Sequence, residues 1–171
     1  MDEVYYHFTD AKDFTTALPY IKAGKKIIGV NSFSKAYGLA GLRLGYAYST
    51  PEIAAYVRML IKPFFINTLS LEAAIAALAD KDHLEKTAML IQSEKPRVYQ
   101  ALDEVGMHYW KSQGNFILIK PAIDIKEFEN KMLKEGVMVR PVANFGAPGC
   151  VRVTIGTREA NDAFISALKK M

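Results

Sequence analysis

The chain has 171 residues, of which 50% are hydrophobic and 23% are charged, proportions that are ordinary for a globular protein of one domain with room for a small second lobe. The formal net charge of +4 is spread along the chain without a run of five positive residues, which argues against a nucleic-acid-binding surface. Because Cys150 is the only cysteine, an internal disulfide and a metal site built on cysteines are both excluded.

The first part of the chain alternates strand patterns with helical ones. Residues 26–31 form a mostly apolar run, which predicts a short strand in a sheet that is covered on both faces. A Ser/Gly-rich segment follows, and residues 44–49 predict a second strand. Three helices come next: one that begins at the capping sequence Thr50-Pro51-Glu52 and ends near residue 62, an alanine-rich one over 71–80, and a long one over roughly 82–105 that Pro96 kinks or breaks.

After Gly106 the pattern becomes that of a compact α+β lobe. Strands are predicted over 107–111 and 115–120, around a turn at 112–114. Asp124 and Glu127 fit a capping box for a helix that ends at Gly136. Short strands over 137–142 and 151–155 precede a final helix over 158–170 that Thr157 caps. We therefore divide the chain into an α/β portion, residues 1–100, and a small α+β domain, residues 101–171.

One segment combines residues that suit a phosphate-bearing carbonyl compound. It reads Asn31-Ser32-Phe33-Ser34-Lys35 and continues as Gly41-Leu42-Arg43-Leu44-Gly45-Tyr46. Hydroxyl groups and a guanidinium can hold a phosphate, and glycines let the backbone come close. A lysine beside a bound aldehyde can form an imine. The alternative is an ordinary surface lysine beside a flexible loop.

This segment resembles the lysine signature of the class I and II aminotransferases of fold type I, which use pyridoxal 5′-phosphate (PLP). The serines, lysine, arginine and final Gly-Tyr all stand at that family's spacing. The resemblance implies that Lys35 is the catalytic residue that forms the Schiff base with PLP. It also implies that Ser32, Ser34 and Arg43 hold the cofactor phosphate.

The first residues extend the resemblance. Asp2-Glu3-Val4-Tyr5 is similar to the family's Asp-Glu-Ala-Tyr segment. The resemblance implies that Asp2 pairs with the pyridine nitrogen of PLP and that Tyr5 donates to the phenolic oxygen of its ring. A carboxylate in that place would keep the ring nitrogen protonated and strengthen it as an electron sink. Read alone, Asp2 would be interpreted as part of a disordered acidic terminus, and only its link to the Lys35 pattern favours the cofactor role.

The second half resembles the histidinol-phosphate aminotransferases and their close relatives, through Val139-Arg140-Pro141, the segment 150–159 and Gln113-Gly114-Asn115-Phe116. The resemblance implies that Arg152 binds the acidic end of the substrate, that Arg140 helps to hold a substrate phosphate, and that Asn115 supports this site. The alternative for each arginine is a salt bridge within the lobe, which is the role that we assign to Arg158.

The resemblance implies an α/β chain that forms the C-terminal part of a fold type I transferase, with a partial large-domain sheet and the small lobe. The expected function is amino transfer from a small amine or amino-acid donor to an oxo-acid acceptor, by a homodimer in its full-length form. Neither nucleic acid, membrane nor metal is expected as a partner. Family members carry a large segment before the Asp-Glu-x-Tyr motif, so we interpret the chain as a gene fragment, a shortened chain or one piece of a split protein.

Two other functions remain open. A threonine-phosphate decarboxylase shares this pattern of residues, and a non-catalytic piece that keeps the small lobe would share part of it. The apolar stretches are too short to span a bilayer, and the Met-Asp-Glu start does not resemble a signal peptide. A cytoplasmic location is therefore expected.

Overall fold

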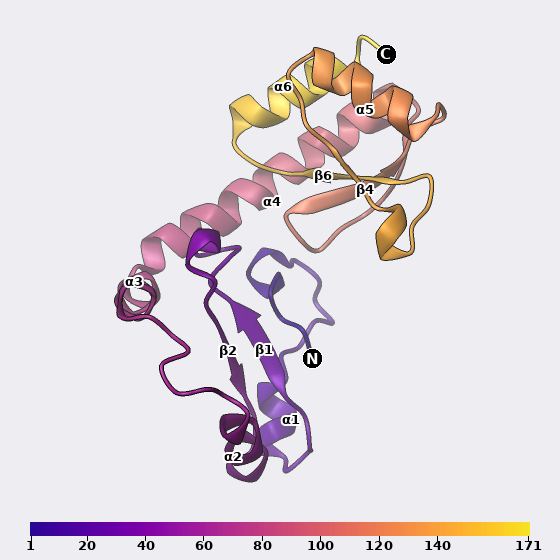
Figure 1. Ribbon diagram of the computed structural model, residues 1–171. Coiled ribbons are helices and arrows are strands. Elements are labelled where there is room, and N and C mark those ends of the chain that lie inside the picture. Colours follow the sequence, from indigo (N-terminus) through magenta and orange to yellow (C-terminus); the bar gives the residue numbers. More distant parts are fainter. The chain divides into compact units, whose positions relative to one another are not determined.

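The computed structural model describes all residues, 1–171. The chain forms two compact units, Met1–Ala88 and Met89–Met171. The helix α4 (Lys81–Glu104) contributes residues to both units (Figure 1). The division between the two units thus falls within a helix. The predicted boundary between residues 100 and 101 concerns the domains of a whole enzyme and stays a prediction.

The first unit is built around a two-stranded antiparallel sheet. Strands β1 (Gly29–Ser32) and β2 (Gly45–Tyr48) pair so that Gly29 lies opposite Tyr48 and Ser32 opposite Gly45. On the other side of β1, Asp2 forms a parallel bridge with Val30. The remaining elements of this unit are η1 (Tyr6–Phe8), α1 (Leu18–Lys22), η2 (Ala40–Leu42), α2 (Pro51–Met59) and α3 (Thr68–Ala79).

The prediction that residues 26–31 are buried on both faces is wrong for this structure. Along β1 the side chains alternate between buried and exposed positions, and Ile28 and Val30 remain 36% and 37% exposed. The apolar run does form a strand, but only one of its faces is covered. The local core lies instead around the following loop, where Phe33, Tyr37, Leu44 and Ala74 pack together.

Two helix ends differ from the predicted capping. The residue Thr50 does stand at the N-cap of α2, with proline at the first turn, but its hydroxyl makes no capping hydrogen bond. Helix α3 begins three residues earlier than predicted because Asn67 caps it: the Asn67 side chain accepts a hydrogen bond from the Ser70 amide at 2.8 Å. A side-chain cap of this kind satisfies one of the free amides of the first turn.

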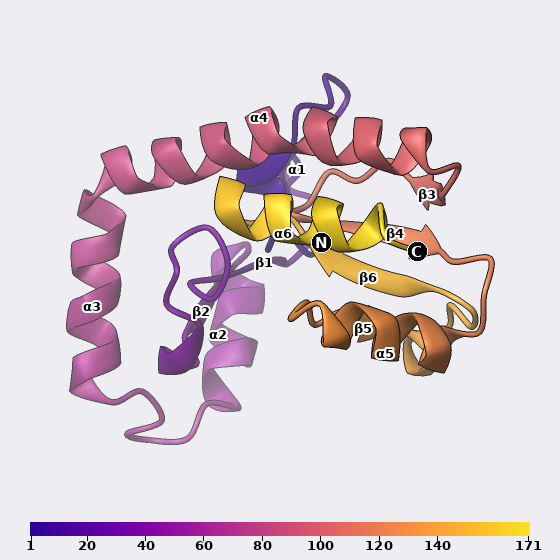
Figure 2. The ribbon, with the colours of Figure 1, turned by 90° about the horizontal axis from the view of Figure 1, so that it is seen from above.

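Helix α4 runs through Pro96 without a break, contrary to the alternative of two helices (Figure 2). Proline removes one hydrogen bond from a helix interior, at a cost of roughly 3 kcal/mol. The buried stripe of α4 offsets this loss, since Ile91, Val98, Ala101 and Leu102 lie within the core of the second unit. No helix of the chain is both long and apolar enough to cross a membrane.

The second unit is an antiparallel sheet in the order β3-β4-β6-β5, with helices over one face (Figure 1). Its buried face carries Ile117, Ile119, Val151 and Val153. The predicted helix starts are confirmed, because Asp124 accepts from the Lys126 and Glu127 amides and Thr157 accepts from the Ala160 amide. Its elements after α4 are β3 (His108–Trp110), β4 (Phe116–Lys120), α5 (Ile125–Lys134), β5 (Arg140–Pro141), η3 (Ala143–Phe145), β6 (Val151–Thr154) and α6 (Arg158–Leu168).

Candidate active site

The Ser/Gly-rich segment forms a hydrogen-bonded loop between β1 and β2. The hydroxyl of Ser32 accepts a hydrogen bond from the Ser34 amide at 3.0 Å and lies 3.4 Å from the Leu44 carbonyl oxygen. The Arg43 guanidinium donates to the Ala40 carbonyl at 2.9 Å and lies 3.5 Å from the Ser34 hydroxyl. Two hydroxyls and a guanidinium therefore lie in one loop.

Arg43 occupies an unusual backbone conformation. Its φ of 52° lies in the left-handed region, which costs a residue with a side chain roughly 1–2 kcal/mol. Its guanidinium forms no ion pair with an Asp or Glu of the chain. The hydroxyl of Ser70 donates to the Leu42 carbonyl at 3.1 Å and so holds the backbone next to Arg43. Strain of this kind is common where a side chain must face a ligand.

A glycine keeps the loop close to the sheet. A Cβ atom at Gly45 would lie 2.7 Å from the Asn31 carbonyl oxygen, so no larger residue fits without moving the backbone. The donors of this loop, together with an arginine that has no acidic partner, match the requirements of a phosphate group. This loop therefore fits the phosphate of PLP.

The structure brings Lys35 and Tyr5 together. The ammonium nitrogen of Lys35 lies 5.5 Å from the centre of the Tyr5 ring, although the two residues are thirty positions apart. The Asp2–Tyr5 segment reaches this place because Asp2 bridges to Val30 in β1, the strand that leads into the lysine loop. Oδ1 of Asp2 accepts a hydrogen bond from the Val4 amide at 2.9 Å.

Beside these residues lies a buried carboxyl group that the sequence analysis did not single out. Glu3 is 3% exposed, and its oxygens lie 2.8 and 2.7 Å from the Tyr48 hydroxyl, which donates to them. The Ala17 amide also donates to Glu3, at 2.6 Å. Burial, followed by the hydrogen bond with Glu3, raises the pKa of Tyr48. A contact between residues 45 positions apart leaves no local signal in the sequence.

Several tyrosines surround this carboxyl group. Burial, together with the nearby tyrosines and Glu3, raises the pKa of Tyr46 to about 12. Burial, Tyr37 and Glu3 raise the pKa of Tyr6 as well. Burial lowers the pKa of His7, whose ring nitrogens have no hydrogen-bond partner and whose ring meets that of Tyr37 edge-on at 5.2 Å. These phenols therefore remain neutral donors at neutral pH.

In the second unit, two arginines face each other across a strand pair. Arg140 of β5 lies directly opposite Arg152 of β6. Neither forms an ion pair; their guanidinium carbons lie over aromatic rings instead, at 5.9 Å from Phe145 and 5.5 Å from Phe116 respectively. Like charges placed opposite each other destabilise a sheet. This pair is therefore suited to bind an anion that compensates both charges.

The other two candidates in this unit have different surroundings. Asn115 is half-buried directly before β4, and its carbonyl oxygen accepts from the Ile155 amide at 2.8 Å, which fixes the end of β6. Arg158 pairs with the buried Glu94 at 3.0 Å, which confirms the structural role assigned to it. Glu94 also accepts from Arg97 and from Asn161, whose amide in turn binds Gly156. This network anchors the start of α6.

The comparison with protein families decides the identity of the chain. The model of the class I and II aminotransferases matches residues 1–168. This chain belongs to the class I and II aminotransferases. Among curated relatives of this aminotransferase chain, histidinol-phosphate aminotransferase 2 of Pseudomonas fluorescens strain Pf0-1 is 38% identical over 171 residues. That match covers all of this chain but 46% of the relative, so the chain spans about half the length of such relatives.

Solved structures agree with this assignment. The histidinol-phosphate aminotransferase from Clostridium acetobutylicum superimposes with a TM-score of 0.89 at 27% identity, over 99% of this chain and 52% of that one. The histidinol-phosphate aminotransferase from Sinorhizobium meliloti, solved in complex with pyridoxal-5′-phosphate, gives 0.80 at 30% identity, over 99% and 47%. The L-threonine-O-3-phosphate decarboxylase from Porphyromonas gingivalis gives 0.85 at 28% identity, over 99% and 53%. The predicted fold, about half of a PLP-dependent aminotransferase, is thus confirmed.

Proposed function

We propose that this chain supplies the lysine-bearing part of a PLP-dependent aminotransferase of the histidinol-phosphate type. The observation that carries the proposal is the grouping of Lys35 with Tyr5 beside the loop that holds Ser34 and Arg43. The family match supports the same assignment. When bound, PLP supplies an electron sink for the negative charge that develops at the carbon next to the amine.

The residues of the first unit would each bind a different part of the cofactor or take part in proton transfer. Ser32, Ser34 and Arg43 would bind the phosphate, and Asp2 and Tyr5 would hold the two polar groups of the ring. Lys35 would hold the cofactor covalently and, when its amine is free, would accept and return the proton at the substrate carbon as general base and acid. No Asp or Glu forms an ion pair with Lys35, so no carboxylate engages its amine.

In the second unit, Arg152 and Arg140 would bind the acidic end of the substrate, a carboxylate or phosphate. Their cross-strand pairing favours an anion with more than one oxygen, since each guanidinium can bind two. Asn115 would hold the adjacent strand ends in register. Such an arrangement orients the donor, and orientation supplies a large part of the rate enhancement in reactions of this kind.

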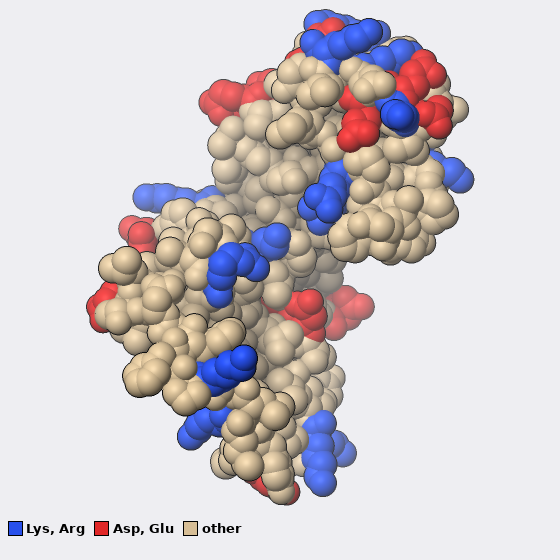
Figure 3. Space-filling view, viewed as in Figure 1, with Lys and Arg blue, Asp and Glu red and all other residues tan.

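A complete enzyme would need polypeptide beyond residues 1–171. Broad uncharged areas of the first unit face solvent (Figure 3). Clusters of exposed apolar side chains often mark an interface. We propose that the part of the relatives that this chain does not match covers them, and that the full-length form is a homodimer in the cytoplasm. Within the first unit, the most exposed apolar side chains are those of Met59, Leu60, Phe64, Phe65 and Leu69.

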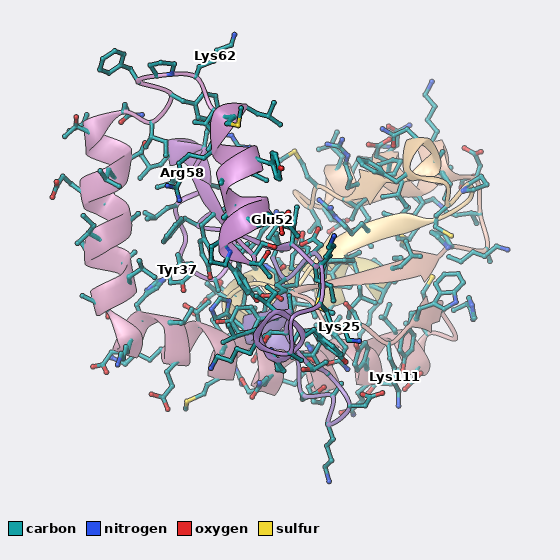
Figure 4. The ribbon with its side chains drawn as sticks, turned by 90° about the horizontal axis from the view of Figure 1, so that it is seen from below. Lys25, Tyr37, Glu52, Arg58, Lys62 and Lys111 are labelled. Carbon is teal, nitrogen blue, oxygen red and sulfur yellow. The ribbon has the colours of Figure 1, made fainter.

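The proposal is tested by reducing the PLP-treated protein with borohydride and mapping the labelled peptide by mass. Label on Lys35, and its loss in Lys35→Ala, is the expected result. Lys25→Ala is the matched control, because Lys25 is an exposed lysine of the same unit (Figure 4). If the wild-type protein carries the label on another lysine and not on Lys35, the assignment of the catalytic lysine is wrong.

A decarboxylase of threonine phosphate is the second candidate, supported by the likeness to the Porphyromonas gingivalis enzyme. Its substrate would offer the arginine pair a phosphate, so the same residues serve both functions. Two incubations of the complete enzyme distinguish these functions, one with histidinol phosphate and 2-oxoglutarate and one with threonine phosphate and 2-oxoglutarate. Formation of glutamate supports amino transfer, whereas release of carbon dioxide from threonine phosphate without glutamate supports decarboxylation.

A further inference from the structure

We propose that Glu3 and Tyr48 form a positioning pair that holds Asp2 and Tyr5 in place at the cofactor site. This inference rests on the proposed function, because it concerns the two residues that would contact the PLP ring. Neither member of the pair is expected to touch PLP itself. Their effect is exerted through the backbone that they fix.

The surroundings of Glu3 make it a fixed point of the segment. Its amide donates to the Val30 carbonyl at 2.9 Å, and its carboxyl group accepts from Tyr48 and from the Ala17 amide. No lysine or arginine pairs with it. A buried carboxyl group is costly unless it is hydrogen-bonded, so these neutral donors decide whether Glu3 can remain inside. Glu3 is thus held from the β1 side and from the β2 side.

A steric feature aims Tyr48 at Glu3. Tyr48 lies opposite Gly29 in the sheet, and a Cβ atom at Gly29 would lie 2.4 Å from the Cζ atom of the Tyr48 ring. The ring therefore crosses the sheet over a position without a side chain. This arrangement carries the hydroxyl from β2 across β1 to the carboxyl group on the far side. Gly29 therefore belongs to the same arrangement as Glu3 and Tyr48.

The positions of Asp2 and Tyr5 follow from that of Glu3. Asp2 is the preceding residue, and its side chain accepts from the amide of Val4 within the same turn. Tyr5 follows two positions later and packs against Lys35. A displacement of about 1 Å in a positioning residue can cost on the order of 10²-fold in rate. Loss of the Glu3–Tyr48 contact would shift both ring partners together.

Four variants separate positioning from general stability. Tyr48→Phe removes the donor, and Glu3→Ala removes the acceptor. Glu3→Gln keeps an oxygen that can accept from Tyr48, so it should largely rescue the effects of Glu3→Ala. Gly29→Ala keeps both groups and displaces the ring. Tyr20→Phe is the matched control, because Tyr20 is an exposed tyrosine of α1.

The first measurement needs no cofactor: amide hydrogen exchange of the purified 171-residue chain. In Glu3→Ala, Tyr48→Phe and Gly29→Ala, the amides of Val4 and Ala17 should exchange at least about tenfold faster, while those of β4 and β6 keep their rates. Tyr20→Phe should change nothing. Unchanged exchange at Val4 and Ala17 in Tyr48→Phe would overturn the proposal, whether or not the chain binds PLP.

The second measurement follows the absorbance of bound PLP against pH. Displaced ring partners should move the midpoint of the spectral change by about one pH unit, a size that protein surroundings often impose. Glu3→Ala combined with Tyr48→Phe should shift it no further than either single variant, because both break one contact. A pair that only stabilised the fold would lower occupancy without moving the midpoint, and that result would refute the positioning role. Failure of the proposed function appears separately, as wild-type protein that carries no label on Lys35.

Discussion

The variant Arg43→Gly should be more stable than the variant Arg43→Ala. Both variants should bind the cofactor equally weakly. Arg43 has a φ of 52°, where any L side chain costs roughly 1–2 kcal/mol and glycine costs almost nothing. The greater freedom of glycine in the unfolded chain offsets about 0.5–1 kcal/mol of that gain. Arg43→Gly should therefore be about 1 kcal/mol more stable than Arg43→Ala, because alanine loses the guanidinium and keeps the strain.

Both substitutions should weaken the binding of PLP, although they differ in their effect on stability. Losing one member of a charge pair costs about 2–5 kcal/mol, and the exposure of Arg43 places the value near 2–3 kcal/mol. That range corresponds to a Kd about 30- to 150-fold weaker for both variants. Arg43→Lys keeps the charge but loses the planar guanidinium, so its Kd should fall between those of wild type and alanine.

Thermal unfolding tests the predicted difference in stability, and PLP titration of the same samples tests the predicted loss of affinity. A difference of about 1 kcal/mol should separate the glycine and alanine variants by roughly 2–4 °C in Tm. Phe64→Gly is the matched control, because Phe64 is the other non-glycine residue with positive φ, at 60°. It should gain stability without changing the Kd. Wild-type PLP affinity in Arg43→Gly would refute the phosphate role, and equal Tm values for Arg43→Gly and Arg43→Ala would refute the strain.

The remaining predictions concern the second unit and the chain as a whole. Arg152→Ala should raise the donor KM and lower kcat/KM with the cofactor spectrum intact; loss of PLP with normal donor kinetics would contradict its assignment. The 171 residues alone should show little transaminase activity and should gain it with the unmatched half of a relative, so full activity of the isolated monomer would overturn that expectation. Burial would raise the pKa of Glu94, but hydrogen bonds from Asn161 and Arg97 and the charges of Arg97 and Arg158 outweigh it, and the pKa is lowered. Its contribution to stability is therefore present above the ordinary pKa of 4.5 and lost as the pH falls through the lowered value. Urea unfolding across this range should find that Glu94→Gln removes this acid sensitivity, and an unchanged pH profile would refute it.

Local patterns predicted the helices well. The side chains of Asp124 and Thr157 accept from amides two or three residues ahead, so their capping depends on the local sequence. The same reasoning failed at Thr50, where the position is right and the hydrogen bond is absent. It also missed Asn67, because an alanine-rich run does not reveal where its helix begins.

Contacts between distant segments could not be predicted in this way. An apolar run such as residues 26–31 indicates a strand but not which face is covered, because that depends on what packs against it. The loop residues Ser34, Lys35 and Arg43 were singled out by their chemistry and by the resemblance to the aminotransferase signature, and the proximity of Ser34 and Arg43 follows from the turn between two paired strands. Glu3 and Tyr48 were missed, since nothing near either residue indicates the other.

The overlap between Gly29 and Tyr48 has a consequence for how this chain could diverge. Any side chain at position 29 would occupy the volume of the tyrosine ring, so a substitution there must be accompanied by a smaller residue at position 48. A smaller residue at 48 would leave the carboxyl group at position 3 with the Ala17 amide as its remaining donor, which would disfavour a buried glutamate there. The three positions should therefore change as a set among homologues, and mutational drift that alters one alone should be rare. In an alignment of lineages that branch near this chain, glycine at 29, tyrosine at 48 and glutamate at 3 should be gained and lost together.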